Sequence, residues 1–384
     1  MKSSLFPRLA SIFTSLFVLL SACGPSASIA KSHLQRNTSP NVASDDIHTL
    51  TDDNNAFALD LYQSLHAQEG NLVYSPYSIF LALAMTYAGA RGETESQMAQ
   101  TMHFSPQNKL HFALNALDLE LAKRGEAKSK DETPLQLDIA NAVWAEQTFP
   151  FLTDYLDVIA QNYGAGIQLA DFAHQHEAVR KEINGWVSNQ TNDKIQNLIP
   201  DRVLDPSTRL VLVNAIYFKA DWLNQFDPNG THDSSFHLLD GLDVQVKMMS
   251  QSLLGILYAQ GAGYQAIELP YQGKAAAMNI IVPDAGNFRE FESTLDAQKL
   301  NRIVSDMQPS SKLELGLPQF SFSTDLDLKE RLTAMGMSDA FEWDRANFSG
   351  MTGGKDLYID AVLHKAFVAV DENEQRPRQL QPWA

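Results

Sequence analysis

The feature that most constrains the fold is an eleven-residue run, 210–220, in which only Asn214 and Lys219 interrupt apolar and aromatic residues. A strand that is apolar on both faces must be covered on both sides, because either face would otherwise lie in water. The run therefore predicts a central strand of a large sheet, with a layer of structure on each side of it.

The first helices are predicted by spacing and by start signals. Apolar residues recur at helical spacing over 57–65, behind Asp52, where we expect the folded part to begin. Ser75 followed by Pro76 is typical of a helix start, since serine caps the first turn and proline is preorganised for it. This pattern predicts a second helix that ends in the glycine-containing turn 89–92.

Helix and strand signals then alternate without a steady rhythm. Thr94 and Gln97 match a capping box and predict the start of a third helix. Further segments predict strands at 135–144, 278–282 and 357–370 and helices at 151–163 and 326–335. The irregular order favours an α+β fold with large sheets over a regular βαβ fold. No internal repeat divides the chain, so we expect one folded domain over residues 51–373.

The chain begins with a targeting signal. Lys2 and Arg8 provide a basic start, and the apolar run 12–20 is too short to span a bilayer as a helix. The signal ends at Cys23, the only cysteine of the chain, in the sequence Leu-Ser-Ala-Cys, which resembles the lipobox of bacterial lipoproteins. That resemblance implies cleavage before Cys23 and lipidation of its thiol. The alternative is an ordinary secretory signal that happens to contain a cysteine.

The amino-acid composition indicates which partners the chain can bind. The formal net charge of −17 argues against a nucleic-acid partner, because phosphate recognition needs clustered Lys and Arg.

Residues 24–50 are polar and contain few large apolar side chains, so we predict a flexible tether between signal peptide 1–23 and the domain. The expected location is outside the cytoplasm, with the lipid on Cys23 in an outer membrane or at the cell surface, and we expect a monomer.

Catalytic and cofactor motifs do not account for the chain. It contains no nucleophile elbow and no phosphate-binding glycine loop, and the sequence Gly261-Ala262-Gly263 predicts a turn. His174, His176 and Glu177 lack a further histidine at helical spacing, so we interpret them as a solvated helix start and not as a metal site. We therefore expect neither an enzyme nor a cofactor.

Three sequence motifs carry a family resemblance. They are the segments 71–98, from Asn-Leu-Val-Tyr-Ser-Pro to Thr-Glu-Ser-Gln-Met, then 212–222, ending in Phe-Lys-Ala-Asp-Trp, and 364–368, His-Lys-Ala-Phe-Val. Together with 245–249 and 317–320 they occur in the order found in serpins, the serine protease inhibitors. The chain resembles this family from about residue 52 to residue 371.

The resemblance implies a fold with a large mixed sheet and surrounding helices, and a mechanism of suicide inhibition. In serpins a serine protease, or in some cases a cysteine protease, cleaves an exposed loop, which then inserts as a new strand into the main sheet. By resemblance, Ser75, Ser78, Asn214 and His364 form the shutter under the opening point. Trp222 lies at the breach, where the loop first enters.

Each of these residues also has a simpler interpretation. Ser75 caps a helix in any case, His364 is equally compatible with a satisfied core histidine, and Trp222 with ordinary packing. The role implied by the resemblance is conformational, and none of these residues is expected to take part in bond making.

The sequence departs from the family after the hinge start, Glu372 and Asn373. Serpin hinges continue with small residues, whereas residues 374–384 contain two prolines and two arginines. Proline removes donors from a strand ladder and buried unpaired charge is costly, so this tail is a poor inserting strand. We predict that the reactive loop and the terminal strands of the family are missing and that the chain as written is inactive.

A frameshift accounts for the tail. One back-translation of 374–384, read with a single G restored in front, encodes Gly-Thr-Glu-Ala-Ala-Ala-Ala-Thr-Ala-Val-Gly, which is a serpin-like hinge. The hypothesis is therefore an inhibitory gene with a lost base or a sequencing error. The alternative from another class is a non-inhibitory, surface-tethered lipoprotein whose vacant sheet binds a foreign peptide or protein.

Overall fold

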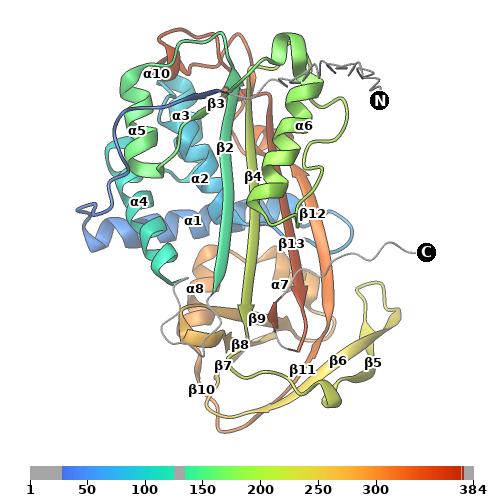
Figure 1. Cartoon of the computed structure of the whole chain (residues 1–384). Coiled ribbons are helices and arrows are strands. Elements are labelled where there is room, and N and C mark those ends of the chain that lie inside the picture. The colour runs from blue at the N-terminus through green and yellow to red at the C-terminus, as the bar shows by residue number, and fades with distance from the viewer. Residues whose placement is uncertain (1–27, 125–134, 373, 376–384) are drawn as a thin grey trace, which may run out of the picture.

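The computed structural model describes residues 28–124, 135–372 and 374–375 (Figure 1). Its largest sheet has the strand order β1-β3-β2-β4-β13-β12, and a short strand, β14, also pairs with β4. The strands are β1 (Ser28–Ala30), β3 (Ile167–Ala170), β2 (Gln136–Glu146), β4 (Leu210–Asp221), β13 (Ala361–Val370), β12 (Phe320–Asp327) and β14 (Glu374–Gln375). The predicted central strand 210–220 is β4, and the strands predicted at 135–144 and 357–370 are its neighbours β2 and β13.

The two faces of β4 belong to different hydrophobic clusters. Leu210 and Leu212 pack into the cluster formed with the helices on one side, while Val211 and Val213 pack into a second cluster under α6 on the other side. This alternation follows from the period of two along a strand. It explains why the run is apolar on both faces, as the sequence predicts.

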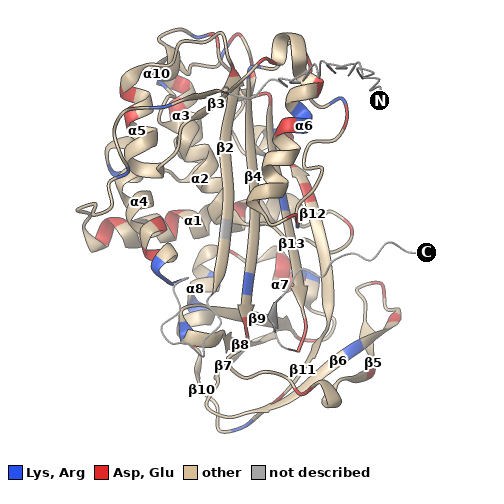
Figure 2. Ribbon diagram, in the orientation of Figure 1, with Lys and Arg blue, Asp and Glu red and all other residues tan. Residues whose placement is uncertain are grey.

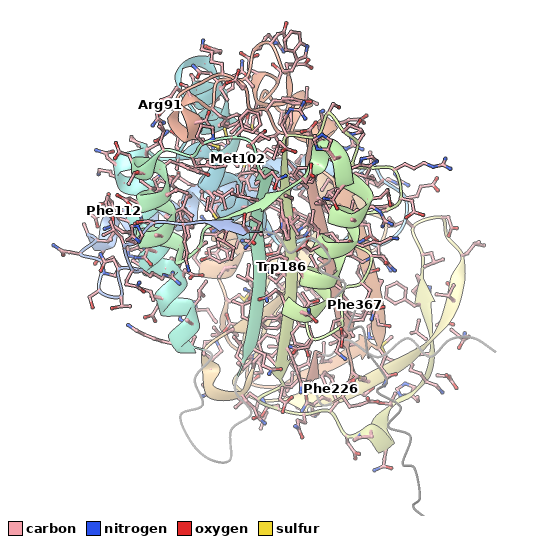
Figure 3. All side chains as sticks on the ribbon, turned by 45° about the horizontal axis from the view of Figure 1, so that its top comes forward. Arg91, Met102, Phe112, Trp186, Phe226 and Phe367 are labelled. Carbon is pink, nitrogen blue, oxygen red and sulfur yellow. The ribbon has the colours of Figure 1, made fainter. Side chains whose placement is uncertain are left out.

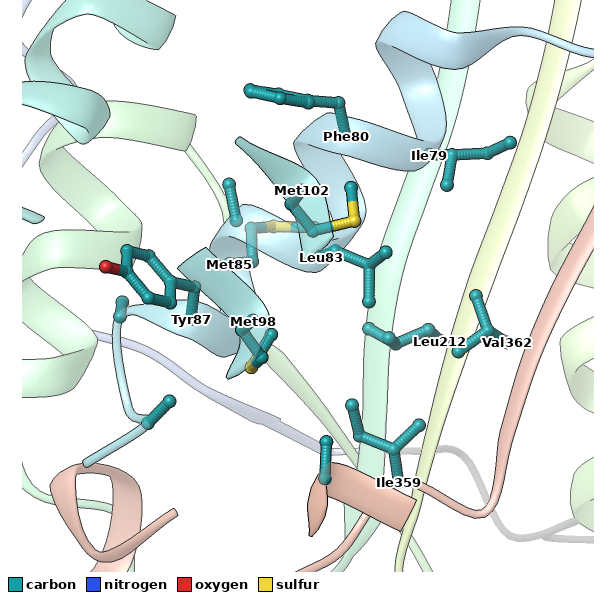
Figure 4. Packing of buried hydrophobic residues seen from close by; sticks show 14 of the residues in the cluster. Ile79, Phe80, Leu83, Met85, Tyr87, Met98, Met102, Leu212, Ile359 and Val362 are labelled. Carbon is teal, nitrogen blue, oxygen red and sulfur yellow. The ribbon is translucent and has the colours of Figure 1, made fainter. Parts of the chain in front are cut away.

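The larger helical layer contains α1 (Ser44–Leu65), α2 (Pro76–Tyr87), α3 (Gly92–Met102), α4 (Gln107–Arg124) and α5 (Thr153–Tyr163). Figure 4 shows Leu83 of α2 beside Leu212 and Val362 of the sheet. The opposite face is covered by α6 (Phe172–Gln190), whose Trp186 packs edge-on against Trp144 of β2 (Figure 3). Charged residues lie mostly on the helices and loops, and the central strands are largely uncharged (Figure 2).

Two smaller sheets lie at the end of the main sheet where β4 terminates (Figure 1). One contains β10 (Gln308–Pro309), β7 (Leu257–Gly261), β8 (Tyr264–Pro270) and β9 (Ala277–Pro283), and the other β11 (Leu313–Pro318), β6 (Asp243–Leu253) and β5 (His232–His237). The remaining elements are the helices α7 (Phe288–Ser293), α8 (Ala297–Ser305), α9 (Lys329–Ala334) and α10 (Ser349–Thr352), and the 3₁₀ turns η1 (Pro228–Gly230), η2 (Gln272–Lys274) and η3 (Asp339–Phe341). The glycines 261 and 263 flank the β7–β8 turn, as predicted, with Gly263 at φ +85°.

The prediction of a flexible tether over 24–50 is wrong for residues 28–50. Residues 28–30 form β1, which pairs with β3, and α1 begins at Ser44, eight residues before the expected start at Asp52. The polar composition misled because this segment is held by hydrogen bonds to distant residues, together with a few apolar residues such as Leu50, which is buried in the main hydrophobic cluster. Asn37 N, for example, donates to Gln161 O at 2.9 Å.

The predicted capping box at Thr94 is also wrong. The third helix begins two residues earlier, at Gly92, and Thr94 lies buried inside it. Its hydroxyl accepts a hydrogen bond from Asn347 N, and Gln97 Oε1 accepts one from Asp339 N. Both side chains therefore satisfy backbone donors of a distant loop, and neither of them caps the helix.

The central strands β4 and β13 separate along their length. They are parallel and pair from Val211–Ala361 to Ile216–Ala366, after which the pairing stops although both strands continue. Beyond that point, β14 pairs with β4 in antiparallel fashion, Glu374 opposite Asp221 and Gln375 opposite Ala220. The sheet thus has a closed half and an open half between the same two strands.

Candidate functional site at the parting of the central strands

A row of polar side chains crosses the closed half of the sheet. Asn141, Asn214 and His364 lie opposite one another on β2, β4 and β13. The amide of Asn214 donates through Nδ2 to Asn141 Oδ1, and its Oδ1 is bonded to His364 Nδ1. Asn214 and His364 are both buried, so each depends on these partners for hydrogen bonding.

The start of α2 completes this network from the helical side. Ser75 N donates to His364 Nε2 at 3.1 Å, and Ser78 Oγ donates to Asn214 Oδ1 at 3.0 Å. Ser75 also caps the helix, because its Oγ accepts from Ser78 N at 3.3 Å. Asn141 Nδ2 donates to Ser78 O at 3.2 Å. The three strands and the helix are joined by polar groups, where the rest of the interface is apolar.

The hydrogen bonds define the state of the His364 ring. Nε2 accepts from a backbone N–H, so the proton of the neutral ring resides on Nδ1 and is donated to Asn214. Burial lowers the pKa of His364 to about 3. The imidazole is therefore neutral at physiological pH, and a second proton on Nε2 would face the Ser75 N–H donor.

At the open half, Trp222 holds the chain as it leaves β13. The indole is buried, stacks on Tyr271 with ring centroids 4.9 Å apart, and donates from Nε1 to Asp371 O at 3.0 Å. Phe226, labelled near the end of β4 in Figure 3, donates from its backbone N to Glu372 O at 3.0 Å. Trp222 thus lies beside the first residues after β13.

The Glu372 side chain binds two further elements. Its Oε1 accepts from Thr231 Oγ1 at 2.7 Å and from Gln319 Nε2 at 2.5 Å. Together with the backbone contacts of 371 and 372, these bonds fix where the chain turns back toward β4. The turn is followed by β14.

The family model that matches this chain is that of serpins, serine protease inhibitors, over residues 52–380. This chain belongs to the serpin family. The leukocyte elastase inhibitor of Xenopus laevis is 37% identical over 324 residues, covering 82% of this chain and 84% of that protein. A serpin-like protein of Methanosarcina acetivorans is 35% identical and covers 83% of this chain and 73% of its own length.

Solved serpin structures match in fold as well. The native thermophilic serpin tengpin superposes with a TM-score of 0.79 at 26% identity, covering 94% of this chain and 90% of its own. Uncleaved ovalbumin superposes with a TM-score of 0.76 at 28% identity, covering 85% of this chain and 87% of its own. The predicted serpin fold, a large mixed sheet with surrounding helices, is confirmed. The family match extends to residue 380, past the end of the domain predicted at 373.

The structure brings the four predicted shutter residues of this serpin into one network. Ser75, Ser78, Asn214 and His364 are all directly or indirectly joined by the bonds described above, and Trp222 lies at the other end of the same strand pair. Cys23 and Asn373 lie outside the described residues. What the shutter and breach residues do in this serpin remains a prediction.

Some site residues escaped the sequence analysis. Asn141 is the clearest, since an asparagine between two alanines in an otherwise apolar strand segment is a detectable anomaly. Gln319 lies inside a motif used for the family resemblance, but nothing in the sequence connects it to Glu372. Thr231 gave no signal at all, because its role depends on how the chain returns after β4.

His174, His176 and Glu177 lie in the first turns of α6. His174 lies in the first turn of α6, where Asp171 accepts from its N–H, and Glu177 pairs with Arg180. The part of the chain that the structure describes contains no group of three His, Cys, Asp or Glu side chains suited to a metal ion. Over the same residues no helix is long and apolar enough to span a membrane.

Proposed function

We propose that this protein derives from an inhibitor of serine proteases. That inhibitor acts by inserting its own loop between β4 and β13. The observation that carries the proposal is the parting of these two strands after Ile216 and Ala366, with β14 already paired to β4. A strand antiparallel to both would replace one parallel pairing with two antiparallel ones. Antiparallel pairing is somewhat more stable per residue, so insertion is favourable once the strands separate.

The polar shutter supports this function physically. Separation requires that β4 and β13 break contact at Asn214 and His364 without disrupting interlocked apolar groups. A hydrogen bond between side chains contributes only about 1 kcal/mol net, and freed groups can rebind to an entering strand. Ser75 and Ser78 can keep their cap geometry on α2 during the exchange.

We further propose that the chain ending in 374–384 is not itself an inhibitor. Beyond Gln375 the remaining tail carries Arg376, Pro377, Arg378 and Pro382, which are unsuited to a buried strand. The nucleotide sequence across codon 373 tests the frameshift hypothesis directly. A downstream frame that lacks the family's terminal strands would contradict it.

To test the proposed function, each of two proteins is mixed with a panel of serine proteases and then analysed by denaturing gel electrophoresis. The two proteins are the product of the restored reading frame and the 384-residue chain. The product of the restored reading frame is expected to form a covalent complex that survives denaturation, and the 384-residue chain is expected to form none. Absence of a complex from the restored product with every protease would count against loop insertion. Cysteine proteases form the second panel.

The proposed location is outside the cytoplasm, at an outer membrane or the cell surface, with lipid on Cys23. Several acyl chains anchor a protein firmly, since each buried methylene contributes about 0.8 kcal/mol. Mass spectrometry of the N-terminal peptide is expected to find a lipid-modified Cys23, and the Cys23→Ser variant is expected in the soluble fraction. An unmodified thiol would favour an ordinary secretory signal.

The open half of the sheet also favours the second candidate, a non-inhibitory protein that binds a peptide strand. There, residues 367–370 of β13 have no pairing with β4, and β14 contributes only two residues. A peptide of hinge-like sequence is expected to raise the melting temperature of such a binder, without any covalent complex with a protease.

A further inference from the structure

The N-terminal strap, residues 28–43, is attached to the body at several points. β1 pairs with β3, and Arg36 donates to Asn115 Oδ1 at 2.9 Å and to Asp118 Oδ2 at 2.6 Å. Asn115 Nδ2 in turn donates to Asn37 O at 2.7 Å. The strap therefore crosses from the edge of the main sheet over α5 and α4 (Figure 1).

The body is shaped to receive the strap. A Cβ added at Gly166 would lie 2.7 Å from Ile29 Cγ2 and 2.8 Å from Ala30 O, so only glycine permits β1 to approach this closely. A methyl group at this position would have to push the backbone of the strap away. The contact is thus a specific fit between two segments that are distant in sequence.

Attachment of the strap shortens the link to the membrane. A free segment from Cys23 to residue 51 would allow an average separation of about 30 Å and a far larger maximum. With Ser28 fixed in β1, only five residue steps remain, and these span at most about 18 Å. If Cys23 carries lipid, as proposed above, the bilayer surface must lie close to Ser28.

The surface around the strap fits a lipid partner. Ile29 is 50% exposed and Leu34 44% exposed on the strap itself, and Phe112 is 44% exposed on α4. Phe112 lies one helical turn before Asn115, which binds the strap, and Figure 3 shows it at the edge of the molecule. In a chain with a net charge of −17, residues 28–43 contain no Asp or Glu and carry Lys31, together with Arg36, which is paired with Asp118 of α4.

We propose that the strap and the adjoining part of α4 face the outer surface of the bilayer that holds Cys23. This proposal rests on the proposed lipid anchor and adds an orientation to it. Ser28 lies level with the start of β4. It pairs with Leu169 of β3, which is level with the end of β2, and the end of β2 pairs with the start of β4. The open half of the sheet ends at Asp221, eleven residues or about 36 Å further along β4, and therefore points away from the membrane.

The test uses the mature chain coupled through its Cys23 thiol to a maleimide lipid in phosphatidylethanolamine and phosphatidylglycerol vesicles. This supplies the anchor whether or not the cell lipidates Cys23, so failure of the anchor and failure of the orientation are distinguished. A photo-cross-linking analogue of phenylalanine replaces either Phe112 or Leu239. Leu239 is 61% exposed in the β5–β6 connection, at the opposite corner of Figure 1.

Lipid adducts at position 112 are expected to exceed those at position 239 several-fold. Equal yields at the two positions would overturn the proposal. Inserting a flexible Gly/Ser segment of about twenty residues after Gly24 is expected to remove the difference, since it lengthens the tether without touching the body. Persistence of the full difference in that variant would show that the short link does not set the orientation.

The Gly166→Val variant tests the strap separately. It is expected to release β1 and to lower the adduct yield at position 112 toward that at 239, while thermal unfolding reports whether the body remains folded. Arg36→Ala, which leaves Gly166 intact, is the second variant and is expected to act in the same direction but more weakly. Unchanged yields in a folded Gly166→Val protein would contradict a role of the strap.

Discussion

The two halves of the central strand pair are built from different contacts. In the closed half, β4 and β13 are paired residue by residue and joined to α2 through Asn214 and His364. In the open half, the same strands are not paired with each other, and the chain after β13 is held by Trp222 and by contacts to Glu372. One half is held by strand pairing and the other by contacts to the exit of the chain.

This difference indicates where β4 and β13 can separate at a low cost in free energy. Opening in the open half breaks few interactions between β4 and β13, because their pairing has already ended at Ile216 and Ala366. Progress into the closed half requires the hydrogen bonds of the shutter to exchange. We therefore expect the shutter to set the barrier and the breach residues to set where entry begins.

The largest expected effect is that of Asn214→Ala, which breaks the closed half. The substitution leaves Ser78 Oγ, His364 Nδ1 and Asn141 Oδ1 without their buried partner, at about 1–3 kcal/mol each, and we expect a total loss of about 4 kcal/mol. Urea unfolding measures it. The exposed Ser321→Ala on β12 is the control, and an equal loss in both variants would contradict the special role of the shutter.

The next effect is the pH dependence that His364 contributes in the closed half. Because the pKa of folded His364 is lowered to about 3, the unfolded chain binds the proton first, and stability is lost as the pH falls below about 6.5. The slope is about 1.4 kcal/mol per pH unit, or about 3 kcal/mol by pH 4.5.

A His364→Gln variant isolates this contribution. Burial also lowers the pKa of His111 to about 4, and that group remains in both proteins. The variant should therefore show a shallower loss of stability between pH 6.5 and 4.5 than the parent, measured by urea unfolding at each pH. Parallel curves would mean that His364 does not titrate with a lowered pKa.

The smallest effect concerns the open half. Trp222→Phe keeps most of the packing against Tyr271 but removes the Nε1 donor to Asp371 O, at a cost of about 1 kcal/mol. We expect faster amide exchange at residues 226, 371, 372, 374 and 375, with exchange in β4 residues 211–216 unchanged. Faster exchange in both halves would show that they are coupled and would contradict the distinction between the closed half and the open half.

The sequence sufficed for the central elements because their signals are local. The apolar run of β4 and the Ser75–Pro76 start of α2 depend on residues close in the chain, and both predictions were correct. The strap was mistaken for a free tether because its order comes from partners such as Asn115 and Gly166, which no local pattern connects to it.

The site was predictable only through family motifs. Those motifs named Asn214 and His364, whose contact depends on two strands that are 150 residues apart in the chain. Asn141 stands in the same row but was missed, because a single asparagine in a strand does not reveal its partner. The point at which β4 and β13 separate was not predictable either, since it depends on register and not on residue type.

The division of β4 between two hydrophobic clusters has a consequence for how this gene can vary. Inserting or deleting a single codon within Leu210–Asp221 would turn every following side chain to the opposite face of the sheet. Asn214 would then point toward α6, and valines that pack into one hydrophobic cluster would face the other cluster. Length variation among natural relatives should consequently be absent from this strand and concentrated in the loops that flank it.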